Sequence, residues 1–517
     1  MNINKICREN KNGFIYTSNL GLAGFLFVDF GDDHVIFNEI GSDPLTFYIT
    51  NITQENEGVI TIDKNNEHNL NNLKSHYVIF KNIKGMTELN DQKPIKIKIL
   101  STESFSKGNT TNYQKYISGG IVKEIYIPFN KKFYSLEESF LNPFTDDTPG
   151  QSLNMKKGEK ELFHICIIAL HHFYSIHNYL PELNNKKHYL EILELVKLLI
   201  QIGKEKEWIK KINMIDEKFI ENIIRWCRSS ISPICSFLGG IVSQEIIKFT
   251  GNYTPISQWF YFNFFETTLN LKDHCDRNLN NSRYNEQISI FGNEIQEKLS
   301  DLNIFMIGAG ALGCEFLKNF ALMGIGTNKN KIISVTDNDS IELSNLNRQF
   351  LFRNSDIGKS KSLVACRECK IINKELNLKY YNLKLDFKNE NIFNDNFWEE
   401  QDLIIGAVDN ESARSYIDNW CTFYNKIFLD CGTMGTEASS FVFFPKKTIC
   451  YNDIVKPTNK IIPMCTLKQF PSSIEHCIEY GKIKFHSFFE KKINDINLLL
   501  NNYNEFFSLI NKNNNDN

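Results

Sequence analysis

The residues best suited to chemistry begin with a glycine-rich run, Gly308-Ala309-Gly310-Ala311-Leu312-Gly313. It follows a strand-like segment at 303–307 and opens a helix-like segment at 314–323, which is the context that gives this motif meaning. Backbone N–H groups at a helix start, with the positive end of the helix dipole, favour a bound phosphate. A tight turn without a ligand is the alternative. Asp337 ends the next predicted strand and could hold ribose hydroxyls.

Two cations follow that a dehydrogenase does not need. Arg348 comes just after the second predicted strand, and Lys361 lies with Lys359 at the start of a predicted helix, 359–376. Hydride transfer leaves the cofactor's pyrophosphate intact, whereas cleavage of a triphosphate at its α-phosphate requires neutralisation of charge on both fragments. The two cations are predicted near carboxyl ends of strands, where such folds bind ligands. They favour triphosphate cleavage, with solvated surface charge as the alternative.

A carboxylate and an amide, Asp409 and Asn410, end another predicted strand at 403–408. Mg²⁺ is usually held by one or two carboxylates together with phosphate oxygens, so Asp409 is a candidate metal ligand. Asp409 could also cap the helix predicted from Glu411, and the two roles are compatible.

A candidate nucleophile, Cys465, lies in an irregular segment between prolines. It precedes a helix announced by Ser472 and Glu475, which have the spacing of a capping box. A thiol near a helix N-terminus or a lysine loses its proton more readily, and the thiolate could attack an acyl adenylate. A buried, inert thiol is the default alternative.

These residues need a scaffold, and the chain changes character along its length. Strands alternate with helices from about residue 282, which predicts a parallel, doubly wound sheet. Short β segments precede residue 115, and helical periodicity covers 158–229. Between them and the alternating part, 230–265 predicts a buried helix and strand, with Gly239-Gly240 allowing close approach of another backbone.

Composition narrows the possible functions. The 517 residues carry 58 Lys and Arg against 61 Asp and Glu, so no basic footprint for nucleic acid is expected. No export signal or apolar run of about 20 residues is visible, which predicts no membrane association. The 13 cysteines are scattered and odd in number, so a reducing compartment is predicted. Cys366 and Cys369 lack a second pair at zinc spacing, which argues against a metal there.

Together these motifs resemble the ubiquitin-activating enzymes, and the segments that carry the resemblance are 308–315, 336–352, 407–410 and 463–471. Upstream, 21–30 and 85–90 resemble that family's first catalytic-cysteine half-domain. Residues 158–226 resemble its four-helix insert, and 230–261 resemble the end of its inactive adenylation half.

The resemblance implies a multidomain α/β fold, with a Rossmann-like adenylation domain preceded by a small β domain and a helical bundle. The implied segments are a β-barrel-like domain at 1–115, a linker and strand at 116–157, the bundle at 158–229, the end of the inactive half at 230–281, the active adenylation domain at 282–460, and the start of the catalytic-cysteine domain with an Asn-rich tail at 461–517.

The resemblance also implies an activity. ATP and Mg²⁺ would adenylate the ubiquitin C-terminus, Cys465 would take ubiquitin as a thioester, and ubiquitin-conjugating enzymes would receive it. The implied nucleotide contacts are Ala311, Asp337, Arg348, Lys361, Asp409 and Asn410, with Asp409 as the Mg²⁺ ligand and Asp339 and Asn345 as neighbours. A complete form is expected to be a monomer of the cytoplasm and nucleus.

The chain departs from the family pattern at both ends. It begins inside the inactive half and ends soon after Cys465, which a partial gene model or a natural fragment would explain. Three alternatives therefore stay open: an incomplete fragment that only binds ubiquitin or nucleotide, an activator of another ubiquitin-like modifier, and a dehydrogenase that binds NAD.

Replacement of the candidate nucleophile tests its implied role. In a complete form of the protein, Cys465→Ala should block thioester formation and leave adenylation intact, because Cys465 lies outside the glycine-rich nucleotide motif. The measurement is a ubiquitin conjugate that reductant removes, followed on non-reducing gels. A conjugate of that kind surviving in the variant would defeat the assignment.

Overall fold

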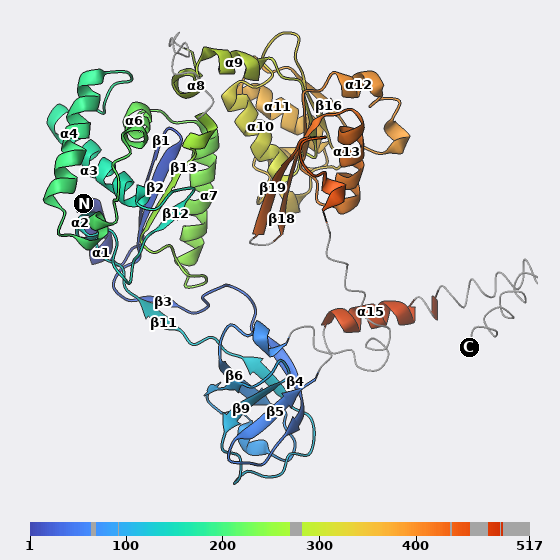
Figure 1. The fold of residues 1–517 in the computed structure, drawn as a ribbon. Helices are drawn as coiled ribbons and strands as arrows, with labels where there is room; N and C mark the ends of the chain where they lie inside the picture. Colours follow the sequence, from blue (N-terminus) through green and yellow to red (C-terminus); the bar gives the residue numbers. More distant parts are fainter. Residues whose placement is uncertain are drawn as a thin grey trace, which may run out of the picture. The chain divides into compact units, whose positions relative to one another are not determined.

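The computed structural model describes residues 1–63, 69–90, 92–268, 282–434, 437–454, 474–485 and 488–489. The chain forms two compact units. One comprises residues 1–36 and 129–455, and the other comprises residues 37–128 and 456–517 (Figure 1).

The second unit contains a seven-stranded antiparallel sheet in the order β7-β6-β10-β4-β5-β9-β8. Its strands are β4 (Thr46–Ile52), β5 (Gly58–Ile62), β6 (Tyr77–Lys81), β7 (Ile95–Lys96), β8 (Lys98–Ile99), β9 (Ser104–Gly108) and β10 (Ile121–Glu124). Alternate residues of β5 are buried, as expected of strands with one face on a core. That core is apolar and includes Phe47, Ile60, Phe80 and Phe105. The same unit also holds helix α15 (Ile474–Phe485).

The boundaries predicted for this β domain, 1–115, are wrong at both ends. Strands β1 (Phe14–Leu20) and β2 (Ala23–Asp29) belong to the first unit, in a four-stranded sheet with the order β1-β2-β13-β12. β10 comes from the segment predicted as a linker and strand of the inactive adenylation half, but it lies between β6 and β4 in the second unit's sheet. The physical reason is long-range pairing: β2 pairs with β13 (Trp259–Asn263), which follows more than two hundred residues later.

β2 is buried along its whole length because its sheet is covered on both faces. Phe25 and Phe27 pack into the core shared with the helical bundle, while Leu26 and Val28 face a second cluster. The remaining elements of this region are α1 (Asn2–Glu9), β3 (His34–Ile36), β11 (Phe129–Lys131), α2 (Leu136–Leu141) and β12 (Gln151–Leu153).

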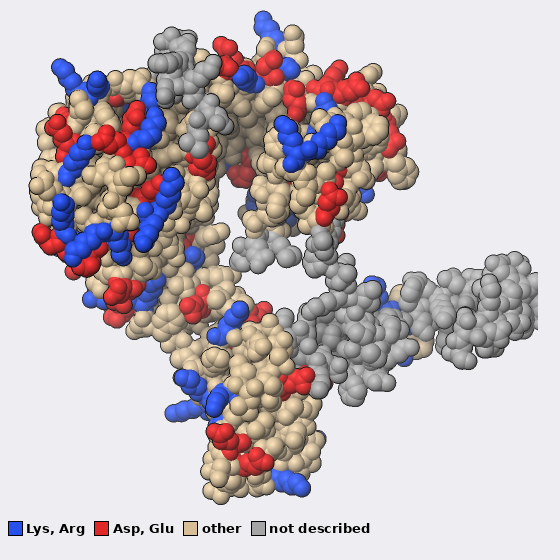
Figure 2. Space-filling view, in the orientation of Figure 1, with Lys and Arg blue, Asp and Glu red and all other residues tan. Residues whose placement is uncertain are grey.

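The helical bundle comprises four helices: α3 (Glu159–His177), α4 (Lys186–Ile202), α5 (Glu207–Lys210) and α6 (Glu217–Trp226). Trp208 and Trp226 are buried in its core. Figure 2 shows Lys and Arg side chains interspersed with Asp and Glu over this part of the surface. Pairs such as Lys197–Glu217, with 2.7 Å between Nζ and Oε1, account for part of that mixture. Exposed pairs of this kind contribute little to stability.

Helix α7 (Ser232–Lys248) differs from the buried helix that the sequence predicts. Its Ile241 and Val242 pack against the β2 side of the sheet, but Ile246 and Ile247 are more than half exposed. Among the described residues, no atom outside the helix's own backbone and the adjacent residues lies within 4 Å of a Cβ built on Gly239 or Gly240, so the described part of the chain does not form the expected close backbone approach. The strand of the pair, β13, is buried as predicted.

The C-terminal part of the first unit contains a six-stranded sheet in the order β16-β15-β14-β17-β18-β19, parallel except for β19. Its strands are β14 (Ile304–Ile307), β15 (Ile333–Thr336), β16 (Leu378–Tyr381), β17 (Leu403–Gly406), β18 (Ile427–Met434) and β19 (Glu437–Phe443). Its helices are α8 (Asn285–Phe291), α9 (Asn293–Ser300), α10 (Ala311–Met323), α11 (Lys361–Ile372), α12 (Asp395–Glu399) and α13 (Glu411–Phe423).

Alternation along β14 explains why helices cover both faces of this sheet. Ile304 and Met306 pack into a cluster with α10 and α11, whereas Phe305 and Ile307 pack with α12 and α13. Successive side chains of a strand point to opposite faces, so two cores result. The predicted multidomain α/β class with a doubly wound parallel sheet is confirmed. Among the described residues, no helix is long and apolar enough to span a membrane.

A buried carboxylate organises the second unit's sheet. Glu124 is fully buried, and its two carboxylate oxygens accept backbone N–H bonds from Leu45 at 3.0 Å, Lys74 at 2.7 Å and Ser75 at 2.6 Å. Hydrogen bonds to a charged acceptor are stronger than neutral ones, and an unpaired buried N–H is costly.

Glu124→Gln should therefore loosen this unit locally. The amide can accept at only one of its two ends, so at least one N–H donor loses its partner, at a cost of about 2 kcal/mol. Hydrogen exchange of the Leu45, Lys74 and Ser75 amides in the full chain should then quicken by about thirtyfold, because 1.36 kcal/mol is tenfold. Glu57→Gln, an exposed change in the same unit, is the control. Equal protection in both variants would contradict this role.

Candidate functional site

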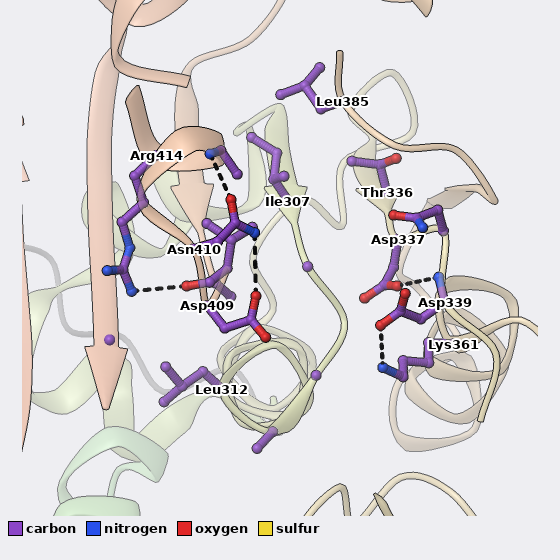
Figure 3. A pocket seen from close by; sticks show the side chains of 18 of the residues that line it. Ile307, Leu312, Thr336, Asp337, Asp339, Lys361, Leu385, Asp409, Asn410 and Arg414 are labelled. Carbon is purple, nitrogen blue, oxygen red and sulfur yellow. Dashed lines mark hydrogen bonds and ion pairs between the residues drawn. The ribbon is translucent and has the colours of Figure 1, made fainter. Parts of the chain in front are cut away.

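A cavity with a volume of about 940 Å³ lies at the carboxyl ends of β14, β15 and β17, where such sheets bind ligands. Figure 3 shows Asp337, Asp339 and Lys361 on one side of it and Asp409, Asn410 and Arg414 on the other. Its lining includes every predicted nucleotide contact and both predicted neighbours: Ala311, Asp337, Asp339, Asn345, Arg348, Lys361, Asp409 and Asn410.

The glycine-rich run forms the turn between β14 and α10. Gly308 has φ +99°, a backbone conformation that favours glycine, and a Cβ there would collide with the Ala407 carbonyl oxygen. A Cβ on Gly313 would likewise collide with the Gly308 carbonyl, so helix and turn are in close contact. Gly310 has room for a side chain: among the described residues, the nearest atom to a Cβ built there is Gln349 Nε2, at 3.9 Å. The first turn of α10 thus faces the cavity with room for a phosphate.

Asp337 supports this turn from the end of β15. Its carboxylate accepts the Ala309 N–H at 2.7 Å and the Asp339 N–H at 2.8 Å. Burial raises the pKa of Asp337, while the two N–H donors and the Lys361 charge oppose that rise. A carboxylate has about four acceptor positions, so the predicted contact with ribose hydroxyls is compatible with both bonds.

The two predicted cations both line the cavity. Lys361 is the first residue of α11, and its Nζ lies 2.7 Å from Asp339 Oδ2 with a side chain only 10% exposed. Arg348 is exposed, and its Nη1 donates to the Ser344 carbonyl at 2.9 Å, which leaves other guanidinium N–H groups for a ligand. Lys359 does not line the cavity and pairs with Asp356 instead.

The residue that caps helix α13 is Asn410 and not Asp409, for which the sequence suggested this role. Asn410 Oδ1 accepts the Ala413 N–H at 2.8 Å and is the N-cap of α13. Asp409 is exposed at the cavity wall, where Asn410 Nδ2 donates to its Oδ1 at 3.4 Å. A hard carboxylate oxygen in this position suits Mg²⁺, which prefers oxygen ligands and needs few from the protein.

Sequence reasoning missed Gln349 and Arg414. Gln349 is part of the predicted motif but received no role; it is buried at the cavity wall, and its Oε1 has no hydrogen-bond partner among the described residues. Arg414 lies one helical turn after Asn410, a spacing that places it at the same end of α13 and could have identified it. It forms an ion pair with Asp430, 3.1 Å between Nε and Oδ1.

Three cysteines were considered in the sequence: the predicted nucleophile Cys465 and the pair Cys366 and Cys369. The predicted nucleophile Cys465 lies outside the described residues, so its role stays a prediction. Cys366 and Cys369 are buried in α11, and burial raises the pKa of Cys366 to about 12 and also raises the pKa of Cys369. Such thiols bind metals poorly, and no cluster of three potential metal ligands occurs within the described parts of the chain.

Three segments of the chain match models of known protein families. Residues 284–494 match the ThiF family, residues 55–125 the ubiquitin-activating enzyme E1 FCCH domain, and residues 127–200 the ubiquitin-activating enzyme E1 four-helix bundle.

Full-length relatives extend the match along almost the whole chain. "Ubiquitin-like modifier-activating enzyme 1" of Dictyostelium discoideum is 37% identical, over 97% of this chain and 48% of its own length. "Ubiquitin-activating enzyme E1 1" of Candida albicans is 35% identical, over 96% and 48%. The human "Ubiquitin-like modifier-activating enzyme 1" is 34% identical, over 97% and 47%. The chain is a homologue of the ubiquitin-activating enzymes. It spans about half the length of these relatives.

The match of residues 284–494 to the ThiF family and the homology to ubiquitin-activating enzymes argue against the dehydrogenase alternative. A solved structure titled "Crystal structure of E. coli MccB + AMPCPP + SeMeT MccA" is 27% identical over 34% of this chain and 51% of its own, with a TM-score of 0.30. So low a score carries no argument.

Two glycines of the turn should respond differently to substitution. Gly308→Ala forces a side chain into positive φ and against the Ala407 carbonyl, which should destabilise the adenylation domain by about 1–3 kcal/mol. Calorimetric melting of the full chain should show its transition about 2–4 °C lower for each kcal/mol lost. Gly310→Ala has open space and should melt near the parent temperature. Equal melting of the two variants would show that the contact at Gly308 does not constrain the turn.

Proposed function

We propose that this chain provides the nucleotide-binding half of a ubiquitin-activating enzyme. In this proposal, ATP and Mg²⁺ adenylate the ubiquitin C-terminus with release of pyrophosphate. The Cys465 thiolate then attacks the acyl carbonyl of the adenylate, which forms a ubiquitin thioester and releases AMP, and ubiquitin passes on to ubiquitin-conjugating enzymes, in the cytoplasm and nucleus. The observation that carries the proposal is the convergence of the glycine turn, two cations and two acidic loops on one cavity of about 940 Å³.

The placement of charge supports cleavage of a triphosphate. The first turn of α10 supplies backbone N–H groups for phosphate oxygens. Arg348 and Lys361 come from different elements yet line the same cavity, so they can neutralise the α-phosphate and the departing pyrophosphate together. The ion pair with Asp339 positions the Lys361 ammonium. The Lys361 side chain is largely shielded from water, which strengthens its interaction with a bound anion.

Asp409 is the residue that would hold Mg²⁺. When bound, the metal would neutralise phosphate charge as the pyrophosphate leaves. Asn410 contacts the Asp409 carboxylate while its own Oδ1 caps α13, which limits movement of this loop. Asp337, on the opposite side of the cavity, is occupied with the Ala309 and Asp339 N–H groups and suits ribose better than metal.

The choice of ubiquitin as substrate rests on the relatives, two of whose names mention a ubiquitin-like modifier and one ubiquitin. These names support ubiquitin or a close relative of it as the substrate. Transfer through Cys465 rests on the motif that surrounds it in the sequence.

Asp409→Ala tests the metal assignment on the 517-residue chain. Calorimetric affinity for ATP with excess Mg²⁺ should fall at least about tenfold, since even indirect metal contacts are worth that much. Without Mg²⁺, affinity for ATP should stay equal or rise, because a negative charge has been removed. ATP–pyrophosphate exchange in a complete form should be lost in parallel.

The matched control is Glu399→Ala, which removes an exposed acid outside the cavity lining. It should bind ATP as the parent does. Parent-like Mg²⁺-dependent binding by Asp409→Ala would exclude Asp409 as the ligand.

A further inference from the structure

Arg414 occupies a position in the cavity wall that the proposed chemistry has not used. Its Nη2 donates to the Val408 carbonyl at 2.9 Å and to the Cys431 carbonyl at 3.3 Å. Its Nε lies 3.1 Å from Asp430 Oδ1, and the Asp430 side chain is only 4% exposed. One guanidinium therefore joins the end of β17 to the adjacent strand β18, beside the loop that carries Asp409 (Figure 3).

From these contacts we infer that Arg414 is a positioning residue for the Mg²⁺ ligand Asp409. The Val408 carbonyl belongs to the peptide group that joins Val408 to Asp409, so its bond to Arg414 restrains the backbone on the N-terminal side of the ligand. Asn410 restrains the C-terminal side through its cap on α13 and its contact with the Asp409 carboxylate. The inference rests on the proposed function, since it concerns the same site.

The surroundings of Arg414 are shaped for a guanidinium. A Cβ added to Gly432 would lie 2.5 Å from Arg414 Nη2, so a side chain at that position would displace the group. Cys431 Sγ donates to the Gly406 carbonyl at 3.2 Å, which is a second contact between β17 and β18. Asp430 supplies the counter-charge that a largely buried cation requires.

An arginine is needed here because two carbonyl acceptors and the charge of Asp430 must be held by one side chain. The planar guanidinium offers N–H groups in a fixed fork, whereas a lysine ammonium is a point charge on a flexible stem. Lysine could reach Asp430 or the Val408 carbonyl but would not hold both in register. Arg414→Lys keeps the charge and removes the geometry, so it separates positioning from electrostatics.

The experiment measures how ATP binding by the 517-residue chain depends on free Mg²⁺. The Mg²⁺ concentration for half-maximal tightening should rise about tenfold in Arg414→Lys, at the low end of the effect of groups that orient metal ligands. Affinity for ATP without metal should stay within about twofold, because Arg414 holds the loop and not the nucleotide. With Mn²⁺ as probe, the paramagnetic resonance spectrum of the Mn²⁺–ATP complex on the variant should approach that on Asp409→Ala.

A matched control separates this effect from a general loss of an arginine. Arg283 also donates to a backbone carbonyl, that of Ile372, but lies outside the cavity lining. Arg283→Lys should leave the Mg²⁺ midpoint unchanged. If Arg414→Lys does not fold, as judged by melting, the double variant R414Q/D430N decides in its place, because it removes both charges together and leaves the net charge unchanged. It should raise the midpoint about tenfold as well.

A folded variant with the parent's Mg²⁺ midpoint and Mn²⁺ spectrum would overturn the positioning role, even if its melting temperature were lower. In that case ATP binding by the parent, and its loss of Mg²⁺ dependence in Asp409→Ala, would leave the proposed function standing. A parent chain that binds no ATP would overturn the proposed function and this inference together.

Discussion

The close approach of the Gly308 backbone to the Ala407 carbonyl holds the glycine turn beside the loop of Asp409, and both line the cavity. Gly308 and Ala407 follow central strands of the parallel sheet, and no side chain fits between them. The glycine turn and the start of α10 therefore lie beside the loop of Asp409. A phosphate bound at the turn would be close to a metal bound by Asp409. The other residues that line the cavity lie around this contact.

Electrostatic balance in the cavity is arranged before any ligand binds. Lys361 is paired with Asp339, Arg414 with Asp430, and the Asp337 carboxylate with two backbone N–H groups. Pairing reduces the desolvation cost of charges in a partly buried site. Arg348 is the most exposed of the three cations, and a bound triphosphate could recruit it without breaking an ion pair. Such preorganisation limits the rearrangement needed during the reaction.

The rest of the first unit is held by contacts between distant parts of the chain. β2 pairs with β13, and the bundle helices share one core with that sheet. In the second unit, one carboxylate, Glu124, gathers amide groups from two loops. Each device joins segments whose separation in sequence is large, which explains why the first domain boundary was misplaced.

Local pattern in the sequence determined the α/β class, the nucleotide motif and the residues that line the cavity, because the glycine turn, strand ends and helix starts are set by neighbouring residues. Asp337, Arg348, Lys361 and Asp409 could be found in this way, whereas Ala311 and Asn410 followed from the resemblance to the ubiquitin-activating enzymes. Tertiary structure alone decided that β1 and β2 leave the β domain, that Asn410 caps α13 in place of Asp409, and that Arg414 bridges two strands. Strand pairing and side-chain contacts across a sheet depend on residues far apart in the chain, and no local pattern encodes which of them meet.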